Sequence, residues 1–199
     1  MCQAGSAALA FFYFDHRDAA KLDSRSLLSS LLIQLGNQSD RFCDVLSTLY
    51  TAHDRGSRQA GEDELMQCLQ DMISLPGQSP IYIILDALDE CSDSPGLVSP
   101  RADVLEIIKK LINMQTSVHF CIFSRPEVDI RRVLEPLSNH TISLDKHDGQ
   151  NECIAEYIKS VVHSDSRMRE WPEEYKGLVI GTLTRRCGGM YAVKFYDTL

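Results

Sequence analysis

The sequence lacks the short motifs that would define its chemistry at once. No two cysteines are spaced as Cys-x-x-Cys, so a zinc ribbon or a thiol-disulfide redox pair has no support. His-Glu-x-x-His and Gly-x-Ser-x-Gly are also absent, which leaves zinc-protease and serine-hydrolase chemistry without a signature. No apolar run approaches the ~20 residues of a membrane helix. We therefore expect a globular protein with no membrane partner.

Positive charge is also scarce. Lysine and arginine total 20 against 28 acidic residues, a formal net charge of −8, so nothing supplies the basic stripe that nucleic-acid binding needs. The seven cysteines are scattered and odd in number, as expected of free thiols in a reducing compartment. An apolar run at residues 7–14 has no basic segment before it and is followed by Asp15-His16-Arg17-Asp18, which indicates a strand and not a signal peptide. These features predict a cytoplasmic protein that does not bind nucleic acid.

Two kinds of segment alternate along the chain. Short runs of β-branched and aromatic residues predict four strands, at 8–15, 81–86, 118–124 and 140–144. Apolar residues at helical spacing predict helices at 23–36, 42–50, 65–73, 104–112, 130–137, 151–162 and 173–186. The alternation predicts an α/β domain whose parallel strands are buried on both faces, in residues 1–146. Residues 147–199 lack a predicted strand and are expected to begin a small helical subdomain.

The segment from Ile81 to Glu90 carries the most information about function. Five apolar residues lead to Asp86, and Asp89 and Glu90 follow within four positions. Ligands of open α/β sheets bind at the carboxyl ends of strands, where these acids would lie. Clustered carboxylates repel one another, and a Mg²⁺ ion held partly through water would compensate their charge. The alternative is that Asp86 caps the next turn and that the other two acids are solvated loop charges.

Residues 81–91 resemble the Walker B segment of NACHT-type ATPases, in particular the fungal nephrocystin-like N-terminal domains. Four other segments resemble the same family in the same order, which makes the likeness more specific than one motif. They are its second sheet strand at 11–15, the following helix at 26–34, the end of its sensor-1 strand at 123–126, and its glycine-methionine-aromatic motif at 188–191. The resemblance implies a P-loop NTPase-like parallel sheet flanked by helices.

The resemblance also implies roles for single residues. Asp86 would hold Mg²⁺ through water, Asp89 and Glu90 would organise the attacking water with Glu90 as general base, and Arg125 would sense the γ-phosphate of ATP or GTP. The alternative for Arg125 is a surface ion pair with Asp129, four positions along a helix. Four other side chains are expected to pack rather than to bind ligands: His119, Cys121, Trp171 and Tyr175.

One part that the resemblance requires is missing. No glycine is followed by lysine, so the phosphate-binding motif GxxxxGK[ST] is absent. The family places its first strand and this loop just upstream of the region that resembles residues 4–15, so the domain is expected to be incomplete at its N-terminus. Without that strand and its helix, apolar surface would be exposed, and we expect marginal stability or aggregation.

Three functions remain open. The resemblance implies a signalling switch in which nucleotide binding drives self-association, or association with sister proteins, and hydrolysis resets it; without the loop we expect no hydrolysis by this chain. The second is a non-enzymatic remnant that keeps the fold and binds partners. The third, a metal-dependent nuclease using Asp86, Asp89 and Glu90, has the least support because a basic surface is lacking.

Overall fold

The computed structural model describes residues 7–18, 21–91, 99–114, 117–143, 148–166, 168–186 and 192–197. The chain forms two compact units, one of residues 1–141 with 194–199 and the other of residues 142–193. Within the described ranges, no helix combines the length and the apolar character needed to cross a bilayer.

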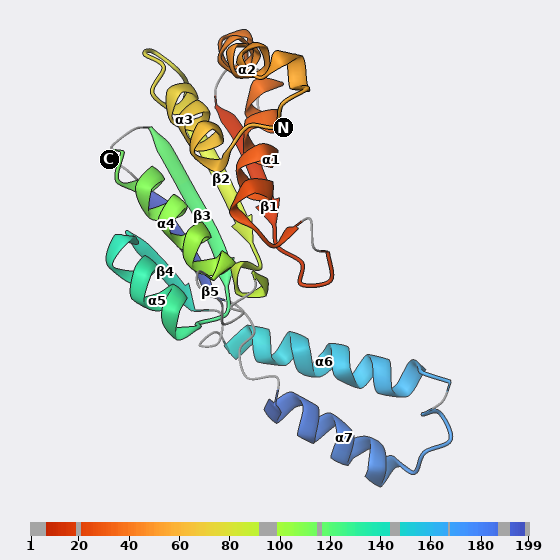
Figure 1. Cartoon of the computed structure of the whole chain (residues 1–199). Coiled ribbons are helices and arrows are strands. Elements are labelled where there is room, and N and C mark those ends of the chain that lie inside the picture. The colour runs from red at the N-terminus through yellow and green to blue at the C-terminus, as the bar shows by residue number, and fades with distance from the viewer. Residues whose placement is uncertain are drawn as a thin grey trace. The chain divides into compact units, whose positions relative to one another are not determined.

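Parallel strands form the centre of the first unit. β1 (Ala8–Tyr13) pairs with β2 (Ile81–Asp86), and β2 pairs with β3 (Val118–Ser124), all in parallel. The strand order is β1-β2-β3-β5-β4, where β4 is His140–Ser143 and β5 is Ala192–Asp197 (Figure 1). The α/β class and the four predicted strands are confirmed. β5 is an element that the sequence pattern did not predict, and residues 188–191 before it lie outside the described part of the chain.

Helices connect the strands of this unit. They are α1 (Ser24–Gly36), α2 (Asp40–Ala52), α3 (Glu62–Ile73), α4 (Pro100–Ile112) and α5 (Val128–Leu134), with short 3₁₀ turns η2 (Asp54–Gly56), η3 (Leu88–Glu90) and η4 (Glu135–Leu137). α1 begins as predicted, because the Asp23 carboxylate accepts a hydrogen bond from the backbone N–H of Ser26 at 2.8 Å. Its leucines at helical spacing form one buried stripe: Leu27, Leu28, Leu31, Leu32 and Leu35.

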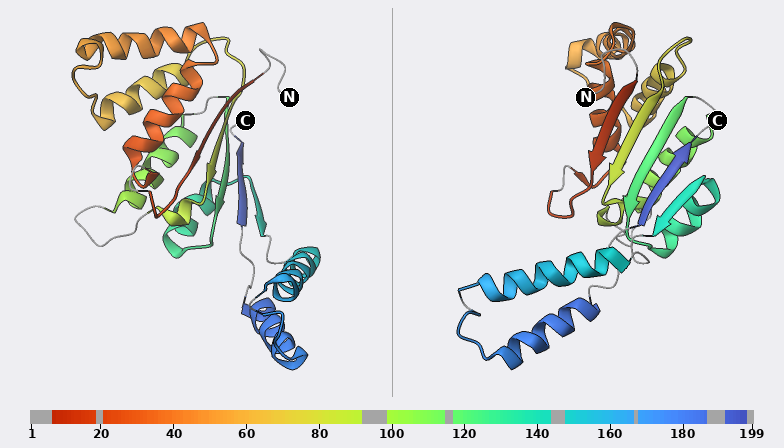
Figure 2. Two further views of the ribbon diagram at one scale, coloured as in Figure 1. Left: turned by 90° about the vertical axis from the view of Figure 1, so that its right-hand side faces the viewer. Right: turned by 180° about the vertical axis from the view of Figure 1, so that it is seen from behind.

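The helices cover only one face of the sheet. The left view of Figure 2 shows α1 to α5 on the same side of the strands. Side chains therefore alternate between buried and exposed along β1, where Phe12 is buried while Leu9 and Phe11 are 40% and 53% exposed. The prediction that the strands are buried on both faces is wrong for β1 and β2. The exposed side is called the open face below, and consists of Leu9, Phe11, Tyr13, Tyr82, Ile84, His119, Cys121 and Phe123.

Two residues that were expected in the core belong to this open face. His119 lies on β3 opposite Tyr82 of β2, and their rings stack with centroids 4.8 Å apart. Cys121 is half-buried beside them, and burial raises the pKa of its thiol. They pack, as expected of residues that are not ligands, but at a surface and not in the interior.

The outer edge of β1 is closed by two glutamine side chains, one in the last turn of α1 and one just after the helix. Gln38 accepts from the N–H of Leu9 at 2.9 Å and donates to its carbonyl at 2.7 Å. Gln34, four positions earlier and within α1, does the same for Phe11 at 3.0 and 2.7 Å. An unpaired strand edge attracts other strands, and these two amides occupy the groups through which pairing would occur. Association of this chain through the β1 edge is therefore disfavoured.

The second unit is a helical hairpin of α6 (Asp148–Ser164) and α7 (Glu173–Arg186). Ile158 and Val162 are buried. Trp171 and Tyr175, which were predicted to pack, are 42% and 59% exposed; Trp171 lies just before α7 and Tyr175 in its first turn.

Candidate functional site

Three chain segments meet at the carboxyl ends of the parallel strands. The backbone N–H of Phe14, just after β1, donates to the carbonyl of Asp86 at 3.0 Å, which joins the ends of β1 and β2. η3 follows β2 directly, and Arg125 follows the last residue of β3. All four residues predicted to act on nucleotide or metal thus lie at the carboxyl ends of the strands. Ligands of open α/β folds bind at these strand ends.

Asp86 lies at the end of β2 with an exposed side chain. One carboxylate oxygen accepts a hydrogen bond from the N–H of Ala87 at 2.9 Å. Ala87 has φ 54° and ψ 42°, in the left-handed region that alanine rarely adopts. The fully buried side chain of Leu88 then anchors η3 in the core. The strained residue turns the chain sharply, so that the acids of η3 lie above the strand ends.

We expect Ala87→Gly to raise the free energy of unfolding by about 0.5–1 kcal/mol. Relief of the left-handed strain, roughly 1–2 kcal/mol, outweighs the greater entropy of glycine in the unfolded chain. Urea denaturation followed by circular dichroism measures the change. Ala102→Gly on the exposed side of α4 is the matched control and should lower stability by about 0.5–1 kcal/mol. Equal losses in both variants would contradict a left-handed Ala87.

Asp89 is bound by Arg125. The N–H of Arg125 donates to Asp89 Oδ1 at 3.0 Å, and its guanidinium Nε lies 3.3 Å from Oδ2. The Asp89 side chain is only 12% exposed, whereas that of Arg125 is 59% exposed. The alternative pairing of Arg125 with Asp129 is wrong, because the Arg125 guanidinium pairs with Asp89 and Asp129 binds another arginine. The contact ties the end of β3 to the acidic turn after β2.

That other arginine, Arg101, was not predicted as part of the site. Its guanidinium donates to the carbonyls of Cys91 (3.0 Å) and Asp89 (3.2 Å) and to the carboxylate of Asp129 (3.2 and 3.3 Å). The side chain is 10% exposed, so these bonds lie mostly away from water. The signal in the sequence was its spacing, since position 101 precedes the apolar stripe of α4 by one helical turn.

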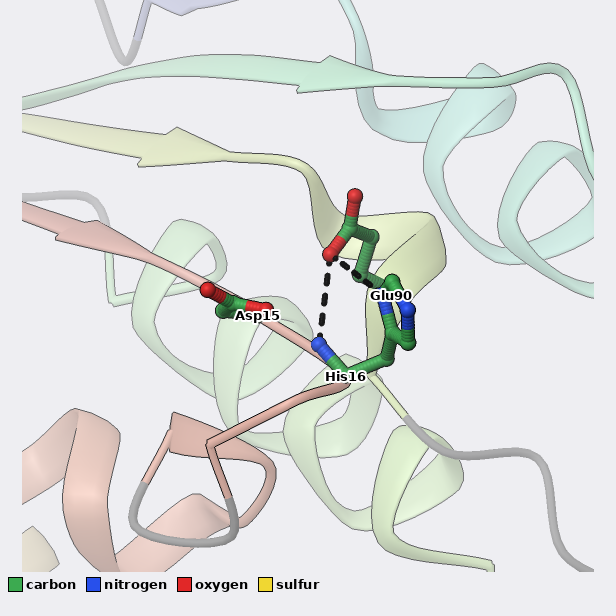
Figure 3. A group of neighbouring side chains, drawn as sticks. All are labelled: Asp15, His16 and Glu90. Carbon is green, nitrogen blue, oxygen red and sulfur yellow. Dashed lines mark hydrogen bonds and ion pairs between the residues drawn. The ribbon is translucent and has the colours of Figure 1, made fainter.

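Glu90 is held by His16, another residue that was not predicted. Glu90 Oε2 accepts from the backbone N–H of His16 at 3.2 Å and lies 3.0 Å from its ring Nδ1. Figure 3 shows both contacts ending on the same oxygen. These hydrogen bonds from His16 hold the pKa of Glu90 below its usual value. Glu90 is therefore ionised at neutral pH.

Asp15, His16 and Glu90 bring three potential ligand atoms within 4.8 Å of one another (Figure 3). The Asp15 carboxylate is already occupied, because Arg17 donates to Oδ1 from Nε at 2.9 Å and to Oδ2 from Nη2 at 3.0 Å. This pairing holds the pKa of Asp15 well below its usual range. A cation at this cluster would have to displace a guanidinium, so the group is better described as an ion-paired loop than as a metal site.

Mg²⁺ would find suitable donors at Asp86. The ion prefers one or two carboxylates together with water and phosphate oxygens, and the exposed Asp86 carboxylate uses one oxygen for its own turn. The sequence offers no glycine-lysine pair to hold the phosphates of a nucleotide. The residues present therefore fit the metal and not the phosphate chain.

A comparison with known protein families matches most of the chain to one family. The sequence model described as Nephrocystin 3, N-terminal, matches residues 1–125, which is more than half of the chain. The protein belongs to the nephrocystin 3 N-terminal family. Searches of curated proteins and of solved structures gave no match. The match confirms the resemblance to nephrocystin-like N-terminal domains. The matched region includes β1, β2, η3 and β3 and ends at Arg125.

Proposed function

We propose that this nephrocystin-type chain is the magnesium-side part of a NACHT-type, P-loop signalling NTPase. The observation that carries the proposal is the placement of three acids at the end of strand β2, with Asp86 as its last residue and Asp89 and Glu90 in the turn that follows. Arg125, which follows the neighbouring strand β3, is bound to Asp89. In such an enzyme Mg²⁺ and ATP or GTP would bind at these strand ends. Binding would drive self-association or association with sister proteins in the cytoplasm.

Each residue would have one task. Asp86 would hold the magnesium ion through water, and the bound ion would neutralise charge that develops on the phosphates. Glu90, ionised and partly exposed, would accept a proton from the attacking water. Asp89 would fix Arg125, whose exposed guanidinium would reach toward a γ-phosphate. Catalysis would then rest on positioning and charge.

Hydrolysis by these residues alone is not expected. The backbone cradle and the lysine that hold the phosphates have no counterpart in the sequence. A second function, a non-enzymatic interaction domain, is favoured by a specific observation: Asp89 and Glu90 are already bonded within the chain, to Arg125 and His16. Both acids thus have partners within the chain and do not need a bound metal ion to supply them.

Line broadening by Mn²⁺ in the ¹⁵N-labelled chain tests the proposal, because Mn²⁺ takes the same oxygen ligands as Mg²⁺. We expect the amides of residues 86–90 to broaden first, and the effect to disappear in Asp86→Asn. The acidic first turn of α3, Glu62-Asp63-Glu64, is an internal control for unspecific attraction. Equal broadening of both segments, or none after β2, would argue for the non-enzymatic domain. Added ATP should not tighten Mn²⁺ binding while the phosphate cradle is lacking.

A further inference from the structure

The two carboxylate oxygens of Glu90 differ in their contacts with the described residues. Its Oε2 is bonded twice to His16, by the backbone N–H at 3.2 Å and by ring Nδ1 at 3.0 Å. Two donors of one residue on one oxygen fix the direction of the carboxylate as well as its place. No bond to Oε1 is found among the described residues, so this oxygen is the one available to other groups.

The two residues come from different strands. His16 lies three positions after β1, Glu90 lies in η3 after β2, and 74 positions separate them. The end of β1 is itself fixed, because Phe14 donates to the carbonyl of Asp86. The two donors of His16 therefore stand at the fixed end of β1. They orient the Glu90 side chain, which lies on the short turn η3.

We propose that His16 is a positioning residue that turns the Glu90 carboxylate toward the end of β1 and leaves Oε1 as its proton-accepting oxygen. The inference deepens the proposed function, since it rests on Glu90 as the general base. Rotation of the ring away from Oε2 would leave the carboxylate held by the backbone N–H alone. His16 thus sets how firmly the base is oriented, without contact with substrate.

The His16 ring can donate to Glu90 in more than one protonation form. Ring Nδ1 must carry a proton to donate to Glu90, which both the imidazolium and one neutral tautomer provide. Asp15 and Glu90 are the acids of this cluster, and Arg17, which is bonded to Asp15, is a permanent cation beside it. The ring is largely exposed, at 67% of the side chain. Substitution of His16 should therefore leave the fold intact.

Titration of the Glu90 carboxyl carbon by ¹³C NMR tests the inference without requiring activity. In His16→Ala we expect the midpoint to rise by about 0.5 pH, because one of the two donors to the ionised form is lost. His16→Asn places an amide N–H near the position of Nδ1 and should restore most of the original midpoint. If His16 only supported the fold, asparagine at this position would not restore the Glu90 midpoint.

The chain offers a matched internal control. Glu64 also has a lowered pKa, caused by the N–H of Gly61 and by His53. Its midpoint should not move in His16→Ala and should rise in His53→Ala. An unchanged Glu90 midpoint in His16→Ala would overturn the inference, as would equal changes at Glu64 and Glu90. If the midpoint moves but Mn²⁺ broadens no resonance of residues 86–90, the His16–Glu90 contact stands and the proposed function fails.

Discussion

Replacing Arg101 by methionine is expected to lower the free energy of unfolding of the sheet unit by about 3 kcal/mol. Methionine keeps the packing of the side-chain stem but removes every donor. The carbonyls of Asp89 and Cys91 then lose a charged partner, and Asp129 loses its ion pair. Domains of this kind are stable by only ~5–15 kcal/mol, so the loss is a large share of the total.

The measurement must report on the correct unit. The single tryptophan, Trp171, lies in the helical unit, so its fluorescence does not follow unfolding of the sheet. Hydrogen exchange of the backbone amides of residues 89–91 does, and circular dichroism in urea adds the loss of helix summed over both units. We expect exchange of these amides to speed up in Arg101→Met, since the turn loses the side chain that holds its carbonyls.

Two controls separate the contacts of Arg101 from loss of charge. Arg132→Met removes an exposed arginine of α5 and should change stability by less than about 0.5 kcal/mol. Asp129→Asn tests the ion pair alone, and because Asp129 is one-third exposed we expect a loss below about 1 kcal/mol. If Arg101→Met cost no more than Arg132→Met, the bonds to the acidic turn would not matter for folding.

Local sequence signals predicted most elements of the fold. Helical spacing of leucines located α1, and apolar runs located β1, β2 and β3, because each pattern depends only on residues next to one another in the chain. The same runs gave a wrong prediction for burial. An apolar strand such as Leu9-Ala10-Phe11-Phe12 reads the same whether a second helical layer covers it or not.

The candidate site was predicted less completely for a related reason. The acids after β2 form a contiguous motif, and the family match includes them. Their partners come from other strands and helices: His16 is 74 positions from Glu90 and Arg125 is 36 from Asp89. Only the register of the parallel strands brings these pairs together. β5 was missed in the same way, since its pairing is set by tertiary structure and not by its own six residues.

The purified chain is expected to self-associate through the open face, and the double variant Leu9→Thr/Phe11→Thr should weaken this association at least tenfold. Both side chains lie on the uncovered side of β1, and large exposed apolar surfaces promote contact between molecules. A tenfold change corresponds to about 1.4 kcal/mol, less than the transfer energy of two apolar side chains that are each about half-exposed. Threonine suits a strand, so the sheet should survive the change. Sedimentation velocity over a range of concentrations measures the effect.

The control must remove two large exposed side chains elsewhere. Tyr157→Gln/Tyr175→Gln removes two rings of the helical unit that are 71% and 59% exposed, and should leave association unchanged. The β1 edge cannot substitute for the open face, because Gln38 already occupies the backbone groups of Leu9 and Gln34 those of Phe11. Should the tyrosine variant become monomeric while the β1 variant still associates, the contact would belong to the helical hairpin and not to the sheet.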